Sequence, residues 1–482
     1  MFSQLDRDRL DLPMFDQLAM RLGVRSLHDF QKRSLLATIG KRDTFLTVPT
    51  GGGKSFCYLL PALVSSGLVL VVSPLVALMR DQQKALEDLD IPSATYDSLL
   101  SQEDRWFVRE KIAQQKLKVL FVSPERLAVP SFRELLAGLP MALIAIDEAH
   151  CVHHWGHGFR PEYRRLGFYL DSLPYAPRMA LTATVTKKER EEIITSLRME
   201  EPVVLAKFNP RENLVLKVMQ YKKAEDRMQT LVARVSETEG QGIIYAPTRR
   251  IADELYVQLK TAGHSVGLYH GGLDSIDRNS AQFEFSIGKA RTLIATKAFG
   301  MGLNIPGIRF VFHAGMPCSI ESYVQEIGRA GRDGEPSVCE LHYGPRDYFL
   351  QKFMIEKSYP EDSVFEAIVS AAYSMLERSD SILLSELTTN LKEAGFMLGE
   401  EVSQVLGFLY QENLLQQEAI VDQFSGKVMP SWHLSAERVE LSEILERKRE
   451  QVKWRLEKLR AMLNLIKAGE SHIPAFIEGY FQ

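Results

Sequence analysis

The sequence is poor in cysteine and has no long hydrophobic run. Its four cysteines, Cys57, Cys151, Cys318 and Cys339, lie far apart and form no C-x-x-C pair. Such spacing indicates neither a disulfide scaffold nor a zinc site, so we expect reduced thiols and no zinc. No segment approaches the roughly 18 consecutive apolar residues of a membrane span, and the charged first residues are unlike a secretory signal. We therefore expect a cytoplasmic protein without a membrane partner.

A large excess of charge of either sign is also lacking. The 58 basic and 62 acidic residues give a formal net charge of −4. The chain as a whole therefore does not attract nucleic acid, and any such binding must use local basic patches. The contents of 45% hydrophobic and 25% charged residues are typical of folded protein. A chain of 482 residues is too long for one core, which predicts about three domains.

Short apolar runs separated by longer amphipathic stretches fill the first two thirds of the sequence. They occur at residues 44–48, 68–72, 118–122 and 142–146 and again at 242–246, 265–269, 291–295 and 309–313. This alternation predicts parallel sheets covered by helices, and it pauses once, near residues 200–218. We therefore expect an α/β fold with two parallel-sheet domains in tandem, spanning residues 1–205 and 206–346.

Beyond about residue 346 this rhythm stops, and a mainly helical C-terminal region, residues 347–482, is expected. Residues 381–395 and 399–413 have helical patterns, and residues 413–434 read as two strands around an Asp-to-Gly turn. Two helices followed by a wing predict a winged-helix module over about 361–435, although a small helical packing domain would have the same pattern.

Leucine, valine and isoleucine spaced at three, four or seven residues predict a helical hairpin over about 436–482. The same stretch carries a row of basic residues, which we interpret as the solvated side of that hairpin. These are Arg447, Lys448, Arg449, Lys453, Arg455, Lys458 and Arg460.

The strongest local motif is VPTGGGKS, residues 48–55, which lies between an apolar strand and a possible helix. Backbone N–H groups of Thr50, Gly51, Gly52 and Gly53 could surround phosphate oxygens, because glycine offers no Cβ obstruction. Lys54 would then reach the β- and γ-phosphates, and Ser55 would hold Mg²⁺. The first glycine of the usual phosphate-loop pattern is replaced by valine, and a glycine-rich turn without function is the alternative.

A pair of acidic residues, Asp147 and Glu148, follows the apolar run at 142–146. An open parallel sheet places such residues beside a phosphate loop. Asp147 would complete the Mg²⁺ environment and Glu148 would polarise the attacking water. Acidic residues at strand ends are commonly just solvated, but this pair and a lysine loop seldom coincide by chance.

Phosphoryl transfer also needs positive charge near the γ-phosphate, and QEIGRAGRDG, residues 325–334, offers it from the second domain. Arg329 and Arg332 are three residues apart, so both can face one cleft if the segment is helical. They are the arginine-finger candidates. If they are not, they are ordinary surface charges.

In this order the motifs resemble those of superfamily 2 helicases, and specifically of the RecQ DNA helicases. The resemblance covers nearly all of residues 20–347 and is specific, because WGHGFRPEY after DEAH and AFGMGLNIP distinguish this family from DEAD-box RNA helicases. Its remaining motifs are PTGGGKS, VVSPLVALMRDQ, VSPERL, LTAT, FNPRENL, YHGGL and SYVQEIGRAGRDG. The resemblance implies that the two α/β domains are RecA-like.

The resemblance also implies roles for residues outside these clusters. Gln31 would contact adenine, Thr182 and Thr184 would couple the nucleotide site to the DNA track, and Gln325 would join the arginines at the ATP cleft. The family usually has a basic residue three positions before the glutamine, whereas this chain has His28. We therefore expect a weaker or differently built adenine clamp.

Four residues fall in the loop that lies between DNA and the ATPase site in this family, namely Trp155, His157, Phe159 and Arg160. Aromatic rings can stack on unpaired bases and arginine can hold phosphate, so the loop could sense DNA. One alternative is that aromatic residues such as Phe159 and Tyr163 are simply buried. Another is a metal site of Cys151, His153, His154 and His157, which is disfavoured because no second shell or carboxylate accompanies it.

The resemblance thus implies an ATP- and Mg²⁺-dependent DNA helicase that moves 3′ to 5′ on single-stranded DNA in repair or recombination. We expect it to act on single-stranded and forked double-stranded DNA as a monomer. The C-terminal region departs from the family, because the wing-like piece precedes the hairpin and no cysteine follows Cys339. Two other functions therefore stay open: a translocase that separates strands poorly, and a non-catalytic scaffold that binds ATP as a switch.

Overall fold

The structure is a computed structural model of the whole chain, and it divides into two compact units. One unit contains Met1–Gly315, Glu321–Tyr343 and Ala468–Gln482, and the other contains Met316–Ile320 and Gly344–Lys467. The structure describes residues 12–49, 51–97, 100–152, 162–206, 211–299, 305, 307–396, 399–412, 414–421, 428–435 and 439–481.

The first unit begins with a seven-stranded parallel sheet of order β3-β4-β2-β5-β6-β1-β7. Its strands are β1 (Thr44–Thr47), β2 (Leu68–Val72), β3 (Ser93–Tyr96), β4 (Val119–Val122), β5 (Met141–Ile146), β6 (Arg178–Thr182) and β7 (Val203–Ala206). All four apolar runs predicted in this region are strands. The strand order changes direction beside β1 and β5, so their carboxyl ends form the crevice in which such sheets bind ligands.

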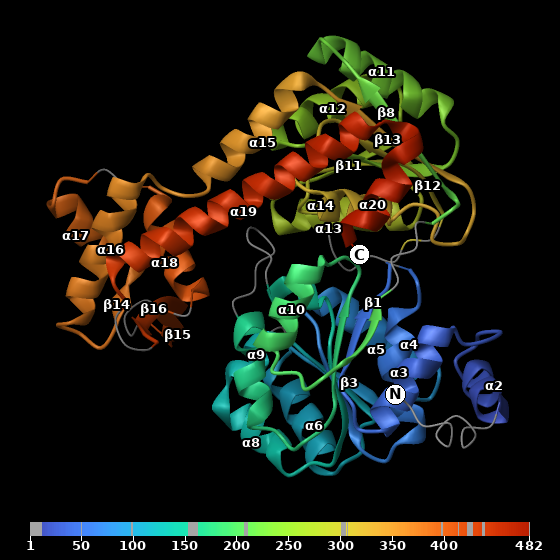
Figure 1. Cartoon of the computed structure of the whole chain (residues 1–482), viewed down its shortest axis with the longest axis vertical. Coiled ribbons are helices and arrows are strands. Elements are labelled where there is room, and N and C mark those ends of the chain that lie inside the picture. The colour runs from blue at the N-terminus through green and yellow to red at the C-terminus, as the bar shows by residue number, and fades with distance from the viewer. Residues whose placement is uncertain are drawn as a thin grey trace. The chain divides into compact units, whose positions relative to one another are not determined.

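Helices cover both faces of this sheet (Figure 1). One face carries α3 (Asp29–Ile39), α4 (Lys54–Val64) and α5 (Val76–Glu87), and α2 (Leu12–Arg21) packs beside α3 and α4. The other face carries α6 (Gln102–Ala113), α7 (Pro124–Ala128), α8 (Pro130–Ala137), α9 (Glu162–Asp171) and α10 (Lys187–Ser196). The strands β1, β2 and β4 are buried on both faces, which explains why they read as continuous apolar runs and not as alternating ones.

The first unit also contains a six-stranded parallel sheet of order β10-β11-β9-β12-β13-β8. Its strands are β8 (Leu214–Gln220), β9 (Gln241–Tyr245), β10 (Val266–Tyr269), β11 (Thr292–Ala295), β12 (Ile308–His313) and β13 (Ser337–Tyr343). The helices α11 (Ala224–Glu237) and α12 (Arg249–Thr261) cover one face, and α13 (Ser275–Ser286) and α14 (Ile320–Ile327) lie on the other (Figure 1). The fold is therefore two RecA-like domains in tandem, as predicted.

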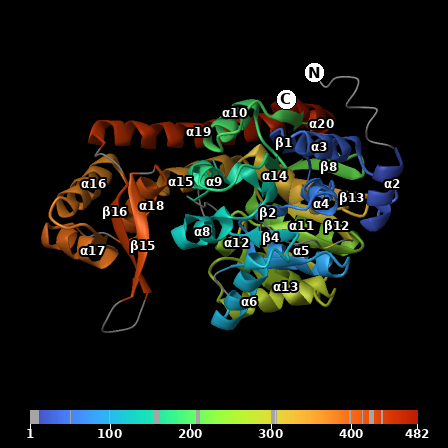
Figure 2. The same ribbon diagram turned by 90° about the horizontal axis from the view of Figure 1, so that it is seen from below.

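The second unit contains a three-stranded antiparallel sheet of order β14-β16-β15 with three helices around it (Figure 2). Along the chain these elements are α16 (Asp362–Leu376), β14 (Ile382–Leu383), α17 (Leu384–Glu393), α18 (Glu401–Gln411), β15 (Leu415–Val421) and β16 (Val428–Leu434). Helix, strand, two helices and a strand pair form the order expected of a winged helix. The sequence predicted α17, α18 and the strand pair but not α16 or β14. The boundaries 361 and 435 stay predictions.

Two further helices of the second unit flank this module in sequence, α15 (Pro345–Lys357) and the long α19 (Leu441–Ala468). The basic row on α19 is solvated at Arg449, Lys453 and Arg460, which are exposed, but not at Lys448, which corrects its interpretation in part. Lys448 is 4% exposed, and its Nζ donates to Pro360 O and to Asp362 Oδ1. Arg447 pairs with Glu412 at 3.6 Å. Basic side chains of α19 therefore neutralise acidic residues of the winged-helix-like module.

The chain ends with η2 (Glu470–His472) and α20 (Ile473–Phe481), which belong to the first unit. Glu470 Oε1 accepts a hydrogen bond from Val218 N of β8 at 2.9 Å, and Tyr480 Oη donates to Glu321 Oε1 of α14 at 3.0 Å. These bonds attach α20 to the second sheet domain. Whether α19 and α20 form the predicted hairpin stays a prediction. None of the described helices is long and apolar enough to cross a membrane.

Candidate nucleotide site

The predicted phosphate loop connects β1 to α4, whose first residue is Lys54. Gly51 and Gly53 have φ values of +79° and +80°, which glycine adopts without steric cost. A Cβ atom on Gly52 would lie 2.8 Å from Val48 Cγ1. Glycine is therefore required at all three positions by the backbone path and by close packing.

Lys54 lies beside the acidic pair that follows β5. Its Nζ is 3.6 Å from Glu148 Oε1, and the two side chains are only 12% and 17% exposed. This Nζ is buried and has no hydrogen-bond partner among the described residues. Because a buried ammonium group is costly without hydrogen bonds, the arrangement favours an anion between the loop and this lysine. The loop and Lys54 therefore fit a polyphosphate.

Asp147 and Glu148 are held at the carboxyl end of β5 by the backbone. Asp147 N donates to Val72 O at 2.9 Å, and Glu148 N donates to Asp147 Oδ1 at 3.0 Å. Glu148 is a non-glycine residue with a φ of +49°. Such strained conformations concentrate at functional sites, because the surrounding structure must maintain them.

The pKa of Asp147 is raised to about 6, first by burial and then by the charge of Glu148, while the charge of Lys54 acts in the opposite direction. A carboxylate that is partly desolvated and placed beside a second carboxylate is stabilised by a cation. Asp147 and the Ser55 hydroxyl offer the oxygen ligands that Mg²⁺ prefers, with water completing its shell. Among the described residues no group of three or more His, Cys, Asp or Glu side chains could hold a metal ion by itself.

Ser55 is oriented by a residue of α5. Gln82 Nε2 donates to Ser55 Oγ at 3.3 Å, and Tyr58 Oη donates to Gln82 Oε1 at 2.5 Å. Burial raises the pKa of Tyr58 well above its usual value, so the tyrosine stays a neutral donor. Gln82 is a site residue that the sequence reasoning did not single out, although it ends the recognised motif at residues 71–82.

A hydrogen-bonded chain leads from the acidic pair to the second sheet domain. His150 Nδ1 is 3.2 Å from Glu148 Oε2 and 3.0 Å from Thr182 Oγ1, and this hydroxyl donates to Thr184 O at 3.1 Å. His150 Nε2 is 3.4 Å from Gln325 Nε2 on α14. These contacts are compatible with a neutral His150 protonated on Nδ1, which would accept the amide hydrogen of Gln325 on Nε2. Three predicted residues, Thr182, Thr184 and Gln325, are thus brought together.

The two predicted arginines have different surroundings. Arg332 approaches the phosphate loop, since its Cγ is 3.4 Å from where a Cβ on Gly51 would lie. Arg329 is 6% exposed, and its guanidinium carbon is 5.6 Å from the ring centroid of Phe299. Burial, followed by the charges of Arg329 and Arg211, lowers the pKa of Arg332 to about 10, so it remains cationic at neutral pH. Arg332 is therefore the arginine that lies against the phosphate loop.

Gln31 is buried on α3, and its carboxamide is attached to the phosphate loop. Its Oε1 accepts from His28 N at 2.8 Å, and its Nε2 donates to Gly53 O at 3.0 Å. The imidazole ring of His28 stacks on Phe30 with centroids 5.6 Å apart. The adenine contact of Gln31 stays a prediction, but the structure adds a link between this residue and the loop.

Several predicted residues lie outside the described part of the chain. They are Thr50 of the loop, the four DNA-coupling candidates Trp155, His157, Phe159 and Arg160, and His153 and His154 of the alternative metal site. Tyr163 is described and is fully buried, and its Oη donates to Asp147 O at 2.9 Å. The simpler interpretation, a buried aromatic residue, is confirmed for Tyr163.

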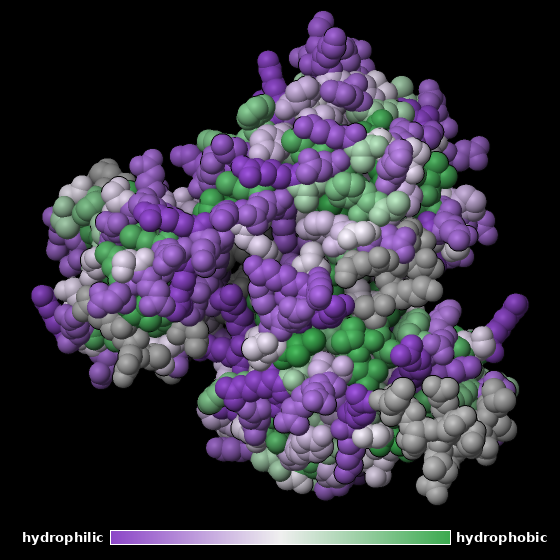
Figure 3. All heavy atoms as spheres, in the orientation of Figure 1, coloured by the Kyte–Doolittle hydropathy of each residue, from purple (hydrophilic) through white to green (hydrophobic). Residues whose placement is uncertain are grey.

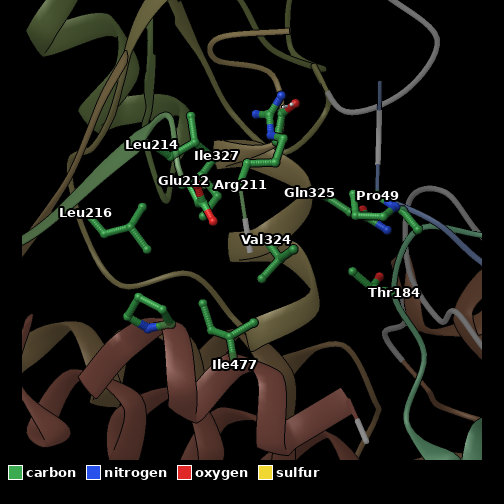
Figure 4. A pocket seen from close by; sticks show the side chains of 13 residues that line it. Pro49, Thr184, Arg211, Glu212, Leu214, Leu216, Val324, Gln325, Ile327 and Ile477 are labelled. Atoms are coloured by element: carbon green, nitrogen blue, oxygen red, sulfur yellow. Dashed lines mark hydrogen bonds between the residues drawn. The ribbon is translucent and has the colours of Figure 1, made fainter. Parts of the chain in front are cut away.

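A cavity of about 340 Å³ lies next to this network (Figure 4). Apolar residues of β8, α14 and α20 form most of its wall, and Ile477 of α20 faces Val324 of α14. Thr184 and Gln325 line it at one end, and Arg211 extends along it toward the turn after α14. Pro49 of the phosphate loop lines the cavity, but Lys54, Asp147 and Glu148 do not, so the cavity adjoins the loop without including its charged residues.

Two family descriptions match the chain. Residues 28–193 match the DEAD/DEAH box helicase domain, and residues 223–334 match the helicase conserved C-terminal domain. Two solved structures have the same fold at low sequence identity. The helicase Lhr of Mycobacterium smegmatis has a TM-score of 0.56 at 19% identity and covers 88% of this chain and 61% of its own. Dbp5 of S. cerevisiae has a TM-score of 0.56 at 20% identity over 74% of this chain and 93% of its own.

Curated relatives are more similar in sequence. The probable ATP-dependent DNA helicase RecS of Bacillus subtilis is 36% identical over 84% of this chain and 81% of the relative. The ATP-dependent DNA helicase RecQ of the same organism is 39% identical over 72% of this chain and 58% of the relative. The chain thus spans most of RecS but little more than half of RecQ. On this similarity and on the two matched helicase domains, the chain belongs to the RecQ family of helicases.

Proposed function

We propose that the chain is an ATP-dependent DNA helicase that moves 3′ to 5′ along single-stranded DNA and serves DNA repair or recombination. The observation that carries this proposal is the arrangement around the phosphate loop. Lys54 Nζ and Glu148 Oε1 of the first sheet domain are 3.6 Å apart, and Arg332 Cγ of the second is 3.4 Å from where a Cβ on Gly51 would lie. Charges from two domains around one loop are what ATP hydrolysis coupled to domain movement requires.

We propose separate roles for the residues of this site. The loop amides and Lys54 bind the phosphates, and Ser55 and Asp147 hold Mg²⁺. When bound, the metal neutralises charge on the phosphate oxygens. Glu148 orients the attacking water and accepts its proton, and Arg332 balances the negative charge that develops on the γ-phosphate. Arg329 supports the same turn from within the second domain.

The His150 chain is suited to connect ATP binding with DNA. Thr182 ends β6 and Thr184 lies two residues beyond it, and His150 contacts Thr182 on one side and Gln325 on the other. We propose that closure of the two sheet domains on ATP tightens the Gln325 contact and shifts Thr184.

Loss of the loop lysine tests the motor assignment. Lys54→Ala should abolish DNA-stimulated ATP hydrolysis and leave binding of a single-stranded oligonucleotide within about twofold of wild type, because DNA contacts lie elsewhere. Lys188→Ala is the control, since that lysine is 78% exposed on α10. Retained turnover in Lys54→Ala would contradict the site assignment. DNA-independent, negligible hydrolysis by the wild-type chain would instead favour a scaffold that binds ATP as a switch.

Polarity and assembly need their own measurements. Wild-type protein should unwind duplexes with a 3′ single-stranded tail and leave blunt or 5′-tailed duplexes paired. It should sediment as a monomer in the presence and absence of DNA. Preferential unwinding of 5′-tailed duplexes would refute the polarity, although not the ATPase site.

A second candidate function is a DNA translocase that separates strands poorly. It is favoured by the charge of the winged-helix-like module, in which residues 361–435 contain twelve acidic residues and only three basic ones, Arg378, Lys392 and Lys427. Hydrophilic side chains dominate the visible surface of this module, with scattered hydrophobic patches (Figure 3). Duplex DNA repels such a surface, so the module is not suited to hold the duplex ahead of the motor.

One pair of assays separates these two functions. A fluorescent forked duplex reports strand separation, and displacement of streptavidin from the end of a biotinylated single strand reports translocation. A helicase should both separate the forked duplex and displace streptavidin, at similar protein concentrations. Streptavidin displacement with an intact forked duplex would identify a translocase.

A further inference from the structure

The turn that carries Arg329 and Arg332 is held in place by hydrogen bonds to its backbone carbonyl groups. It spans residues 328–334, between α14 and β13. Gly331 has a φ of +56°, and its N donates to Ile308 O of β12 at 2.8 Å. One side of the turn is therefore anchored to the sheet, and Gly331 O accepts from Gly334 N within the turn at 3.0 Å.

Arg211 donates to all three of these carbonyls. Its Nη2 donates to Gly328 O at 3.3 Å and, over a shorter distance, to Ala330 O, and its Nη1 is 3.4 Å from Gly331 O. A guanidinium group has five N–H donors in a fixed plane, so it can bind several carbonyls at once. A lysine or glutamine side chain at this position could not replace that pattern.

Asn213 binds the same turn two residues later in the chain. Its Nδ2 donates to Gly331 O at 2.8 Å and to Glu335 O at 2.9 Å, and its backbone carbonyl accepts from Ser337 N at 2.9 Å. A Cβ on Gly331 would lie 2.4 Å from Asn213 Nδ2. The absence of a side chain at Gly331 therefore allows the amide to approach the turn.

Arg211 and Asn213 also occupy a distinctive place in the chain. They lie between β7, the edge strand of the first sheet, and β8, the edge strand of the second. The segment that connects the two sheet domains thus binds the turn that carries the arginines.

Arg211 brings a third positive charge close to the two arginines of the turn. Arg211, Arg329 and Arg332 are close enough that the first two help to lower the pKa of the third. Three cations so close together repel one another, which an uncharged amide in place of Arg211 would avoid. The cluster is relieved when a polyanion lies in front of it.

We propose that Arg211, assisted by Asn213, is a positioning residue that fixes the arginine-bearing turn so that Arg332 faces the phosphate loop. This inference rests on the proposed ATPase function. Arg211 itself does not touch ATP, and it acts by holding three backbone carbonyls. Through Arg211, the segment before β8 stabilises the position of Arg332, the arginine-finger candidate.

Replacement of Arg211 by glutamine tests this role. Arg211→Gln should lower kcat for DNA-stimulated ATP hydrolysis by about 10- to 100-fold, because a misplaced charge stabilises the transition state poorly. The KM for ATP should change by less than about threefold, because the phosphate loop is intact. Arg211→Lys, which keeps the charge but not the fork, should recover only part of kcat.

Arg291 provides a matched control in the same domain. It also donates to three backbone carbonyls, those of Gly240, Val235 and Thr238, but none of them lies in the arginine-bearing turn. Arg291→Gln should lower the melting temperature about as much as Arg211→Gln while leaving kcat near wild type. If both variants lose kcat in proportion to their loss of stability, Arg211 is only structural. If Arg211→Gln does not fold, Asn213→Ala is measured in its place and should show the same kcat loss at constant KM.

A double-mutant cycle decides whether Arg211 acts through Arg332. The Arg211→Gln change should cost no further kcat in an Arg332→Gln background, since the group to be positioned is gone. Additive losses, or a wild-type kcat in Arg211→Gln, would overturn the positioning role. A wild-type chain that hydrolyses no ATP would instead refute the proposed function, so the two failures are distinguishable.

Discussion

The two halves of the candidate nucleotide site are built in different ways. In the first sheet domain, Lys54 is the first residue of α4 and Glu148 is the second residue after β5, so elements that follow two parallel strands of one sheet position both side chains. In the second, Arg332 lies on a turn whose carbonyls are bound by Arg211, more than 100 positions earlier in the chain. The first half is positioned by the ends of strands and the second by side-chain hydrogen bonds from a distant segment, so the two halves should respond differently to substitution.

The largest effect on kcat should follow loss of the positive charge of Arg332 in the second sheet domain. Arg332→Gln is expected to lower kcat by about 10³-fold or more, the range found when an arginine finger is removed. Arg329→Gln should lower kcat less and the melting temperature more, because Arg329 is buried against Phe299. The two variants are compared by DNA-stimulated phosphate release and thermal unfolding. Equal kcat losses would show that both arginines contact the nucleotide.

The second-largest effect on kcat should follow loss of Glu148, the general-base candidate of the first sheet domain. Glu148→Gln should lower kcat by about 10²- to 10⁴-fold and leave ATP affinity within a few-fold of wild type. The reason is that the amide retains the size of the carboxylate but cannot accept a proton from water. Filter binding of radiolabelled ATP, beside single-turnover hydrolysis, separates the two quantities. A loss of ATP binding equal to the loss of kcat would mean that Glu148 mainly holds the loop and Lys54.

The buried carboxylate of Asp147 gives a smaller effect, on stability. Its folded-state pKa of about 6 lies above the ordinary value of 3.8, so the folded chain retains this proton longer than the unfolded chain. Its ionisation therefore costs stability progressively from about pH 4 to pH 6, and the cost is fully present above pH 6. In nucleotide- and metal-free protein, Asp147→Asn should raise the melting temperature at pH 7.5 by about 2–6 °C and have little effect near pH 4. A lower melting temperature at pH 7.5 would contradict the burial argument.

The smallest effect is expected in the winged-helix-like module. Replacing Arg378 and Lys392 together by alanine should change DNA affinity by no more than about twofold and leave the salt dependence of binding unaltered, because an acidic module contributes few phosphate contacts. Fluorescence anisotropy at several salt concentrations measures both. If DNA affinity depended less steeply on salt concentration in the double variant, DNA would contact this module. The expected difference between the module and the sheet domains would then be wrong.

Sequence patterns predicted the parts of the fold whose determinants are local. The eight apolar runs are all strands, because strands buried on both faces are continuously apolar. The strands β3, β6, β7, β8 and β13 were not predicted. Several carry polar or charged residues, such as Arg178 in β6 and Glu340 in β13, whose partners are visible only in three dimensions.

The same distinction applies to the site. The loop, the acidic pair and the arginine motif are contiguous segments with recognisable spacing, and the structure brings them together. The hydrogen bonds of Gln82 to Ser55 and of Arg211 to the arginine-bearing turn could not be predicted, although both residues lie in recognised motifs. Nor could the pairing of α19 with the acidic module, since a basic row on a helix has the same pattern whether or not acids face it.

The measurement that tests the central claim most directly is the affinity for MgADP with aluminium fluoride, a mimic of the transferring phosphoryl group, relative to MgADP alone. The account predicts that wild-type protein with DNA binds the mimic far more tightly than MgADP. It also predicts that Arg332→Gln loses this preference while its MgADP affinity stays within about twofold of wild type. An undiminished preference in Arg332→Gln would contradict the claim that the two domains complete one ATPase site.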